Sequence, residues 1–420
     1  MKKASFAIVL LIFGTLSASA RASAPVALSV DDLPKLVGSK NKHVSAAKSL
    51  LQGSERRTGY LLRSYLPNVK VEAGGESFQT GPFSIRSQPY GDLEGRINLF
   101  RGGRDALEED VRQGQVKVAD SEARQTYFSE LTEARKAFWH LLYQREVLKL
   151  LKAALEQNEK NLAAALKRIR GGLATATDRI EFEINRVQLG QDIARLELEI
   201  TNAQRKLSAL LSMPLDTAFE TADTVPHEHD DAILRASLNI ETHRDVTALK
   251  ANQTVLESQK SQAYRWWTPS LDAYGNYSLY TLRDRDYVSM TDRYETVVGL
   301  KLTLELFDGL QSRSEGAAAS AQADAYADRA AQTSQELAAQ FENSRQELKL
   351  IHDLIHEGEK NVEQGREYLA NTQSEYGRGV KNSPDVLSAT QKYIEFRRRY
   401  AELRRDYQMA KADLLAVLGE

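Results

Sequence analysis

The sequence predicts a mainly α-helical protein with a smaller part that forms a β-barrel. Two stretches, 104–169 and 311–376, contain no proline and have the composition of very long helices. Each stretch follows a pair of segments in which apolar and polar residues alternate, as they do in half-buried strands. Strand pair and long helix occur twice in the 420 residues, which indicates a tandem repeat.

The composition excludes several classes of protein. The chain has 56 basic and 58 acidic residues, and a protein that mainly binds nucleic acid usually has a strong basic excess. It has no cysteine, which rules out disulfides, thiol catalysis, cysteine-bound metals and a lipid-modified N-terminal cysteine. Since we find no nucleophile–base arrangement and no phosphate-binding loop, we expect neither an enzyme nor a cofactor.

The first residues have the parts of a secretory signal peptide. Lys2 and Lys3 precede a short apolar run at 7–13, and the small residues Ala18-Ser19-Ala20 follow. The apolar run is well short of the roughly 20 residues that a membrane-spanning helix needs. We therefore expect residues 1–20 to be removed, with cleavage after Ala20 or Ala22, and the mature protein to work outside the cytoplasm.

The repeat is visible in separated matches at one spacing. The motif Leu-Phe-x-Gly at 99–102 recurs 207 residues later at 306–309, and Gly172 and Asp178 recur at the same spacing as Gly379 and Asp385. Upstream of these motifs the spacing is 202, so the first hairpins of the two copies differ in length. We expect one unit at 44–215, a polar linker at 216–245 and a second unit at 246–420.

Each unit contains two predicted strands joined by a polar hairpin loop. The clearest alternation places Lys301 on one face and an apolar row on the other, and such a row faces lipid in a membrane β-barrel. The row consists of Val298, Leu300, Leu302 and Leu304. We expect strands at about 68–77, 90–99, 270–280 and 296–306, with hairpin loops at 77–89 and 281–294.

Each strand pair leads into a helical hairpin. The long helices, 104–169 and 311–376, would each span about 99 Å at 1.5 Å per residue. After a glycine-containing break, second helices are expected at 178–211 and 385–418, where apolar residues at 4-3 spacing predict coiled-coil packing. Asp178 and Asp385 are expected to open these helices, because a carboxylate there caps free backbone amides.

A single copy of this chain cannot complete its own barrel. Membrane β-barrels have at least eight strands, and four strands would leave two unpaired edges. Two or more chains must therefore combine their strands. This argument does not decide how many.

The residues at the second helical break carry the most specific pattern. Tyr376-Gly377-Arg378-Gly379 and Asp385-Val386-Leu387 resemble a hairpin tip of the TolC family of outer-membrane efflux proteins. Thr177-Asp178 and the two Leu-Phe-x-Gly motifs fit the same family. The resemblance implies a homotrimer in the outer membrane, with a twelve-stranded barrel and a twelve-helix coiled-coil tunnel in the periplasm. It also implies a passive duct that a periplasmic adaptor protein connects to an inner-membrane transporter.

The resemblance also implies roles for residues near the tips. The family closes its periplasmic end with polar contacts between neighbouring hairpins, which assigns this periplasmic gate to Thr177, Asp178, Tyr376 and Lys381. The family usually has arginine at the position of Lys381, so a bidentate contact is lost. An entrance ring is assigned to Asp385 and Ser388. The tips that would dock the adaptor are Gly171, Gly172, Leu173, Gly377, Gly379 and Val380.

Several other patterns allow different interpretations. A periplasmic coiled-coil scaffold or adaptor without a pore would explain the helices but not the lipid-facing rows. A metalloenzyme would need more zinc ligands than His352 and His356 supply, and residues 227–231 are more typical of a solvated linker than of a metal site.

A group of arginines lies on a predicted helix, and a group of aromatic residues lies near a predicted strand. We interpret the arginines between Arg397 and Arg405 as a solvated helix face. Tyr264, Trp266 and Trp267 lie before a strand and suit an aromatic belt at a membrane interface. The cargo of the duct cannot be predicted from the sequence.

Overall fold

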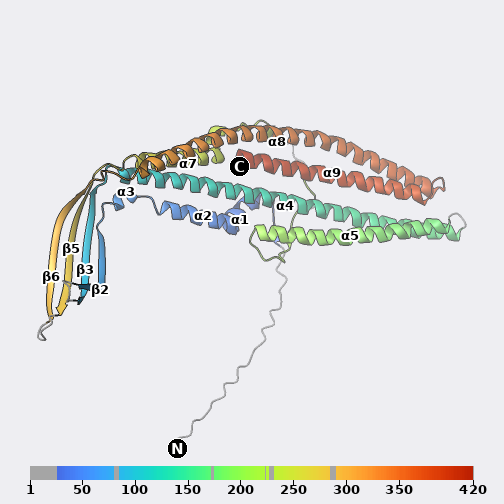
Figure 1. The fold of residues 1–420 in the computed structure, drawn as a ribbon. Coiled ribbons are helices and arrows are strands. Elements are labelled where there is room, and N and C mark those ends of the chain that lie inside the picture. Colours follow the sequence, from blue (N-terminus) through green and yellow to red (C-terminus); the bar gives the residue numbers. More distant parts are fainter. Residues whose placement is uncertain are drawn as a thin grey trace, which may run out of the picture.

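The computed structural model describes residues 26–79, 85–171, 175–222, 224–226, 231–283 and 290–419. The molecule is a long bundle of helices with a four-stranded sheet at one end and two helical hairpin tips at the other (Figure 1). The prediction of a mainly helical protein with a smaller β part is confirmed. The expected signal peptide lies outside the described residues. Among the described helices, none is long and apolar enough to cross a membrane.

The sheet is antiparallel in the order β2-β3-β5-β6. Its strands are β2 (Asn68–Gln79), β3 (Ile85–Phe100), β5 (Ser270–Arg283) and β6 (Met290–Thr303). The strands extend into segments that we predicted to be loops, because ladder hydrogen bonds continue where side-chain alternation has stopped. β6 ends at Thr303, so the prediction that Leu304 belongs to a strand is wrong.

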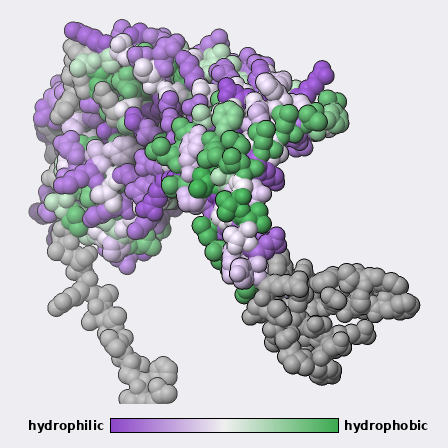
Figure 2. All heavy atoms as spheres, turned by 90° about the vertical axis from the view of Figure 1, so that its left-hand side faces the viewer, coloured by the Kyte–Doolittle hydropathy of each residue, from purple (hydrophilic) through white to green (hydrophobic). Residues whose placement is uncertain are grey.

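The two faces of the sheet differ in polarity. Leu302 pairs with Leu271 and Leu300 pairs with Ala273, whereas Lys301 pairs with Asp272 on the opposite face. The apolar side chains are strongly exposed, with 83% of Val298 accessible. Figure 2 shows hydrophobic residues gathered along the sheet and its junction with the helices.

Two helical hairpins form the rest of the bundle. The long helices α4 (Arg104–Arg170) and α8 (Gln311–Gly377) have 67 residues each, or about 100 Å. The shorter helices α5 (Ala176–Leu210) and α9 (Ser383–Leu418) run back along α4 and α8. Both begin two residues earlier than predicted.

Several short elements flank the long helices between the hairpin tips and the sheet. The linker that we predicted at 216–245 is partly structured. The short elements are β1 (Val26–Ala27), η1 (Val30–Asp32), α1 (Leu33–Lys40), α2 (Lys42–Glu55), α3 (Tyr60–Arg63), β4 (Phe219–Glu220), α6 (Asp231–Leu234), η2 (Ile240–Thr242) and α7 (Arg244–Ala263). α2 packs on α4, and α7 packs between α4 and α8. Since α5 and α9 are much shorter than their partners, α2 and α7 cover the remaining length of the long helices.

Side chains join helix ends where α2 and α7 begin. Asn41 accepts hydrogen bonds from the first amides of α2, and its Nδ2 donates to the Leu210 carbonyl at the end of α5. At the second junction, buried His243 caps α7 through Nδ1, and Arg244 donates to the Ala416 carbonyl of α9. Burial and the nearby Arg244 charge lower the pKa of His243, so the ring is neutral at pH 7 and Nδ1 can accept.

The basic segment of α9 is a solvated face only in its first part, where Arg398 and Arg399 are exposed, and the prediction is wrong for Arg404 and Arg405. Arg404 forms a buried ion pair with Glu146 of α4 and also donates to the Val225 carbonyl at 2.7 Å. Arg405 is mostly buried beside Asp406, with its guanidinium 4.5 Å from the centre of the Tyr143 ring. Charge alternation along α9 could not reveal partners on α4, because these residues are far apart in the sequence.

Candidate gate at the hairpin tips

Reciprocal backbone caps build the tips. The carboxylate of Asp178 accepts from the Thr175 amide at 2.9 Å, and that of Asp385 accepts from the Asn382 amide at 3.2 Å. Each aspartate therefore occupies the third helical position, and the residues that open α5 and α9 are Ala176 and Ser383. The expectation that the aspartates themselves begin the helices is wrong by two residues.

Asp178 also ties the first hairpin to the second. Its Oδ1 accepts from the Ser383 amide at 3.3 Å and lies 2.5 Å from the Ser383 hydroxyl. Partial burial would raise the pKa of Asp178, but hydrogen bonds from Ser383 and Thr175 outweigh it and hold this pKa below its usual range. Asp178 is thus a carboxylate at neutral pH.

A second carboxylate approaches the same hydroxyl. Glu181 Oε2 lies 2.7 Å from Ser383 Oγ, and Ser383 is 1% exposed. A serine hydroxyl has one proton, so it can donate to only one of the two carboxylates at a time. The contact is therefore buried and polar, with more acceptors than donors.

A cation–aromatic contact forms a second tie between the hairpins at their tips. Arg168 of α4 donates to the Tyr376 carbonyl at 2.7 Å, and its guanidinium lies 4.4 Å from the centre of the Tyr376 ring. The Tyr376 ring meets Phe182 edge-on within a small apolar cluster that includes Val386. Burial raises the pKa of the Tyr376 phenol. We call Arg168, Asp178, Glu181, Tyr376 and Ser383 the tip latch.

The structure brings together only some of the residues that we assigned to the gate. Tyr376 and Asp178 belong to the tip latch, whereas Thr177 is exposed. Lys381, in the turn before α9, lies 4.0 Å from Asp385 of that helix, and no contact among the described residues joins it to Asp178. Ser388, one turn beyond Asp385, is also exposed.

The turns at the tips are exposed. Gly379 has φ +83°, a left-handed conformation that favours glycine, and the Val380 amide closes the end of α8 on the Glu375 carbonyl. Val380 is 70% exposed, and Gly171 and Gly377 are also at the surface. Gly172 and Leu173 lie outside the described residues.

Sequence reasoning missed Arg168, Glu181 and Ser383. Asn382-Ser383-Pro384 is a helix-start signal that could have identified Ser383 as the first helical residue. The partner of Arg168 is a backbone carbonyl, which leaves no trace in the sequence. The contact between Glu181 and Ser383 depends on how the two hairpins pack.

The structure does not support the possible metal sites named in the sequence analysis. His352 and His356 have ring centres 4.9 Å apart on α8, but the described part of the chain has no cluster of three or more potential metal-binding side chains. Most of the 227–231 segment lies outside the described residues.

Comparisons with known proteins agree with this architecture. Residues 236–420 match the model of the outer membrane efflux protein family. The fold is similar to the outer membrane protein VceC of Vibrio cholerae, with 15% identity, a TM-score of 0.76 and coverage of 93% of this chain and 96% of that chain. It is also similar to the CmeC outer membrane channel of Campylobacter jejuni, with 14% identity, a TM-score of 0.75 and coverage of 100% and 93%.

A third similar structure is the open state of the MtrE outer membrane channel of Neisseria gonorrhoeae. Its identity is 16%, its TM-score 0.72, and the alignment covers 93% of this chain and 88% of that chain. No curated protein sequence matches significantly. The fold of this chain is therefore similar to the folds of these solved channels, and the resemblance to the TolC-like outer membrane efflux proteins is confirmed.

Proposed function

We propose that this protein is the passive outer-membrane exit duct of a tripartite efflux or type I secretion system. In this role it would receive substrates from an inner-membrane transporter through a periplasmic adaptor protein. The family match and the channel fold support an efflux duct rather than an enzyme.

The observation that carries the proposal is the unfinished sheet. β2 and β6 are its open edges, and one face exposes an apolar row that includes Leu300 and Leu302. Pairing β6 of one copy with β2 of the next would satisfy both edges, because every edge must be paired in lipid. Three copies would give twelve strands and a matching ring of helical hairpins, as the family resemblance implies.

The tip latch supports a resting closure at the other end of the duct. Asp178, Tyr376, Thr177 and Lys381 would lie at the periplasmic gate, and Asp385 and Ser388 would line the entrance. The exposed turns around Gly171 and Gly379 would meet the helical hairpins of the adaptor. Because Asp178 is only half-buried, its contact with Ser383 would be weak enough for adaptor binding to break it.

The experiment that tests the proposal is reconstitution of purified protein into planar bilayers. We expect heat-modifiable trimers in outer-membrane fractions and channels of low resting conductance. A coiled-coil scaffold or adaptor without a pore would give neither insertion nor conductance, and that result would refute the duct.

A further inference from the structure

Five arginines surround the junction between the sheet and the helices. Arg56 and Arg57 lie at the end of α2, Arg63 ends α3, Arg104 begins α4, and Arg265 precedes β5. Arg63, Arg104 and Arg265 lie within five residues of a strand, and Arg56 and Arg57 lie in the turn that joins α2 to α3. We call them the arginine collar.

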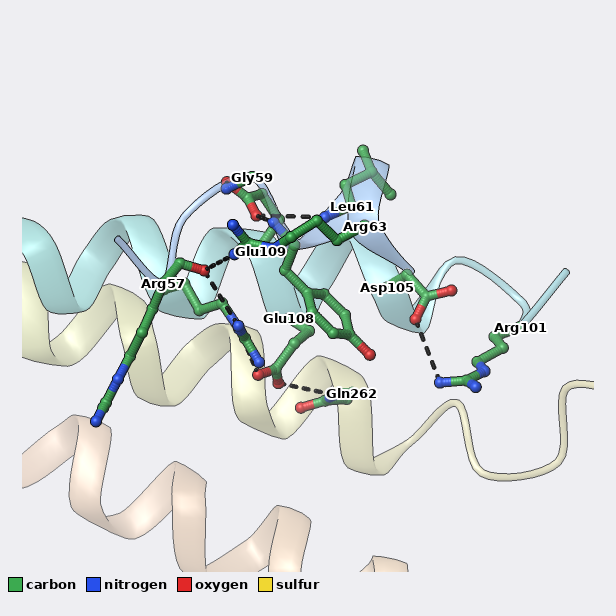
Figure 3. Close-up of polar contacts among 11 residues, drawn as sticks. Arg57, Gly59, Leu61, Arg63, Arg101, Asp105, Glu108, Glu109 and Gln262 are labelled. Atoms are coloured by element: carbon green, nitrogen blue, oxygen red, sulfur yellow. Dashed lines mark hydrogen bonds and ion pairs between the residues drawn. The ribbon is translucent and has the colours of Figure 1, made fainter. Parts of the chain in front are cut away.

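Three carboxylates of this region, those of Asp105, Glu108 and Glu109, are already occupied (Figure 3). Glu109 is buried and accepts from the backbone amides of Gly59, Tyr60 and Leu61 at 2.9, 2.6 and 3.4 Å. Burial would raise the pKa of Glu109, but these amides and Gln113 outweigh it and lower this pKa, so the carboxylate is charged. Its charge is used to hold the α3 turn in place.

Two other acidic side chains of this region have partners outside the collar. Asp105 accepts from Asn98 at 2.7 Å and lies 3.7 Å from Arg101, which is not part of the collar. Glu108 pairs with Arg112 at 3.0 Å and accepts from Gln262. Neither carboxylate is paired with an arginine of the collar.

Three of the collar arginines bond to backbone carbonyls instead. Arg63 donates to the Arg57 carbonyl at 2.7 Å, Arg104 to the Arg101 carbonyl at 3.2 Å, and Arg265 to the Gly102 carbonyl at 3.3 Å. A carbonyl orients a guanidinium but does not neutralise it. In the described part of the chain, none of the five collar arginines forms an ion pair with a carboxylate.

Exposed aromatic and aliphatic side chains accompany the collar. Tyr65, Leu66 and Trp267 are 45%, 63% and 58% exposed and lie between the collar and the first strand residues. Figure 2 shows that the hydrophobic surface continues from the sheet to this junction. Aromatic rings beside basic residues that form no ion pair, at the end of an apolar band, are typical of a membrane interface.

We propose that the arginine collar binds the phosphate groups of anionic phospholipids in the bilayer leaflet on the helical side of the sheet. The inference rests on the proposed function, since it requires the sheet to span the membrane. The charge of the collar matches anionic headgroups, and its position continues the lipid-facing surface. Bound lipid would fix the height of the duct in the membrane.

The three tryptophans allow a direct test. Trp266 and Trp267 lie at the collar, whereas Trp139 is buried in α4, about 50 Å along the helix from Arg104. Phospholipids with brominated acyl chains quench tryptophans that they touch. The full chain would be reconstituted in phosphatidylcholine vesicles that contain brominated phosphatidylglycerol. A second sample would contain the same two lipids with the bromine on phosphatidylcholine instead.

We expect brominated phosphatidylglycerol to associate with the collar at least about fivefold more strongly than brominated phosphatidylcholine. The preference should fall in 0.5 M salt, because exposed charges are screened. Replacing Arg57, Arg63 and Arg265 by glutamine should bring the ratio of phosphatidylglycerol to phosphatidylcholine association close to one. Glutamine keeps an amide donor for the backbone carbonyls, and unchanged channel conductance would show that this variant is folded.

The matched control is Arg186→Gln with Arg195→Gln, two exposed arginines on α5. This control variant should keep the preference of the original chain for phosphatidylglycerol. Equal quenching by both lipids in working channels would overturn the collar proposal and leave the duct intact. The absence of quenching and of conductance would refute the duct, and the collar with it. Lost export by the collar variant without a lipid preference in the original chain would instead identify a protein contact.

Discussion

Replacing Ser383 by alanine should weaken the closure of the hairpin tips. The change removes the hydroxyl that lies 2.5 Å from Asp178 and 2.7 Å from Glu181, so the two carboxylates lose the hydroxyl donor that they share. A hydrogen bond to a charged group contributes about 1.5–3 kcal/mol. Because Asp178 is partly accessible to water, we expect about 1 kcal/mol per copy.

In a trimer the three copies would together contribute about 3 kcal/mol, which shifts the ratio of closed to open channels about 150-fold. Single-channel recording of the purified protein in planar bilayers measures this shift as increased open time or conductance. Ser374→Ala is the matched control, because Ser374 is an exposed serine near the same tip on α8. Conductance that is unchanged in Ser383→Ala would show that the constriction does not depend on the tip latch.

The pH dependence follows from the lowered pKa of Asp178. A carboxyl whose pKa is lower in the folded protein stabilises it above the unfolded value of 3.8, and this contribution is lost as pH falls through the folded value. The contribution of Asp178 to closure should therefore be constant between about pH 5 and 8. A marked opening within this range that disappears in Asp178→Asn would contradict the argument.

Four further changes test other parts of the molecule. Leu302→Arg on the lipid-facing row should cost about 2–4 kcal/mol near the bilayer midplane and reduce heat-modifiable trimers, whereas Lys301→Arg on the opposite face should assemble normally. Gly379→Trp should abolish export but leave trimers in the membrane, and normal export would rule out close adaptor contact at this tip. Asp385→Ala should reduce cation selectivity, measured as reversal potential in a salt gradient, with little change in closure. Thermal stability should fall as pH decreases below 6.5, because the lowered pKa of His243 lets the unfolded chain bind the proton first, and His243→Asn should reduce this dependence.

The long helices could be predicted because their signals are local. Proline-free stretches place α4 and α8 within one residue of their observed ends, and the helix-start residues place α5 and α9 within two. α2 and α7 were missed, since their apolar residues alone do not distinguish them from linker. Their packing on α4 and α8 supplies what local propensity does not.

The contacts of the tips could not be predicted in the same way. Asp178 and Tyr376 were identified by resemblance, but Arg168, Glu181 and Ser383 matter through distances across two hairpins. The repeat indicates which residues are equivalent, not which ones touch. The same limit applies to Arg404, whose partner Glu146 lies 258 residues away in the sequence.

The strengths of the ties between the two hairpins determine where they can separate. In the middle of the bundle, Arg404 and Glu146 have side chains only 11% and 9% exposed, and loss of one partner from such a buried pair costs about 3–5 kcal/mol. At the tips, Asp178 is only half-buried, and its hydrogen bond from Ser383 contributes about 1 kcal/mol because water reaches the carboxylate. Since the tip contacts are the weaker ones, a partner that binds at the tips can part them while the middle stays joined. The hairpins would then move as levers about the Arg404–Glu146 pair, and the sheet at the far end would not need to change.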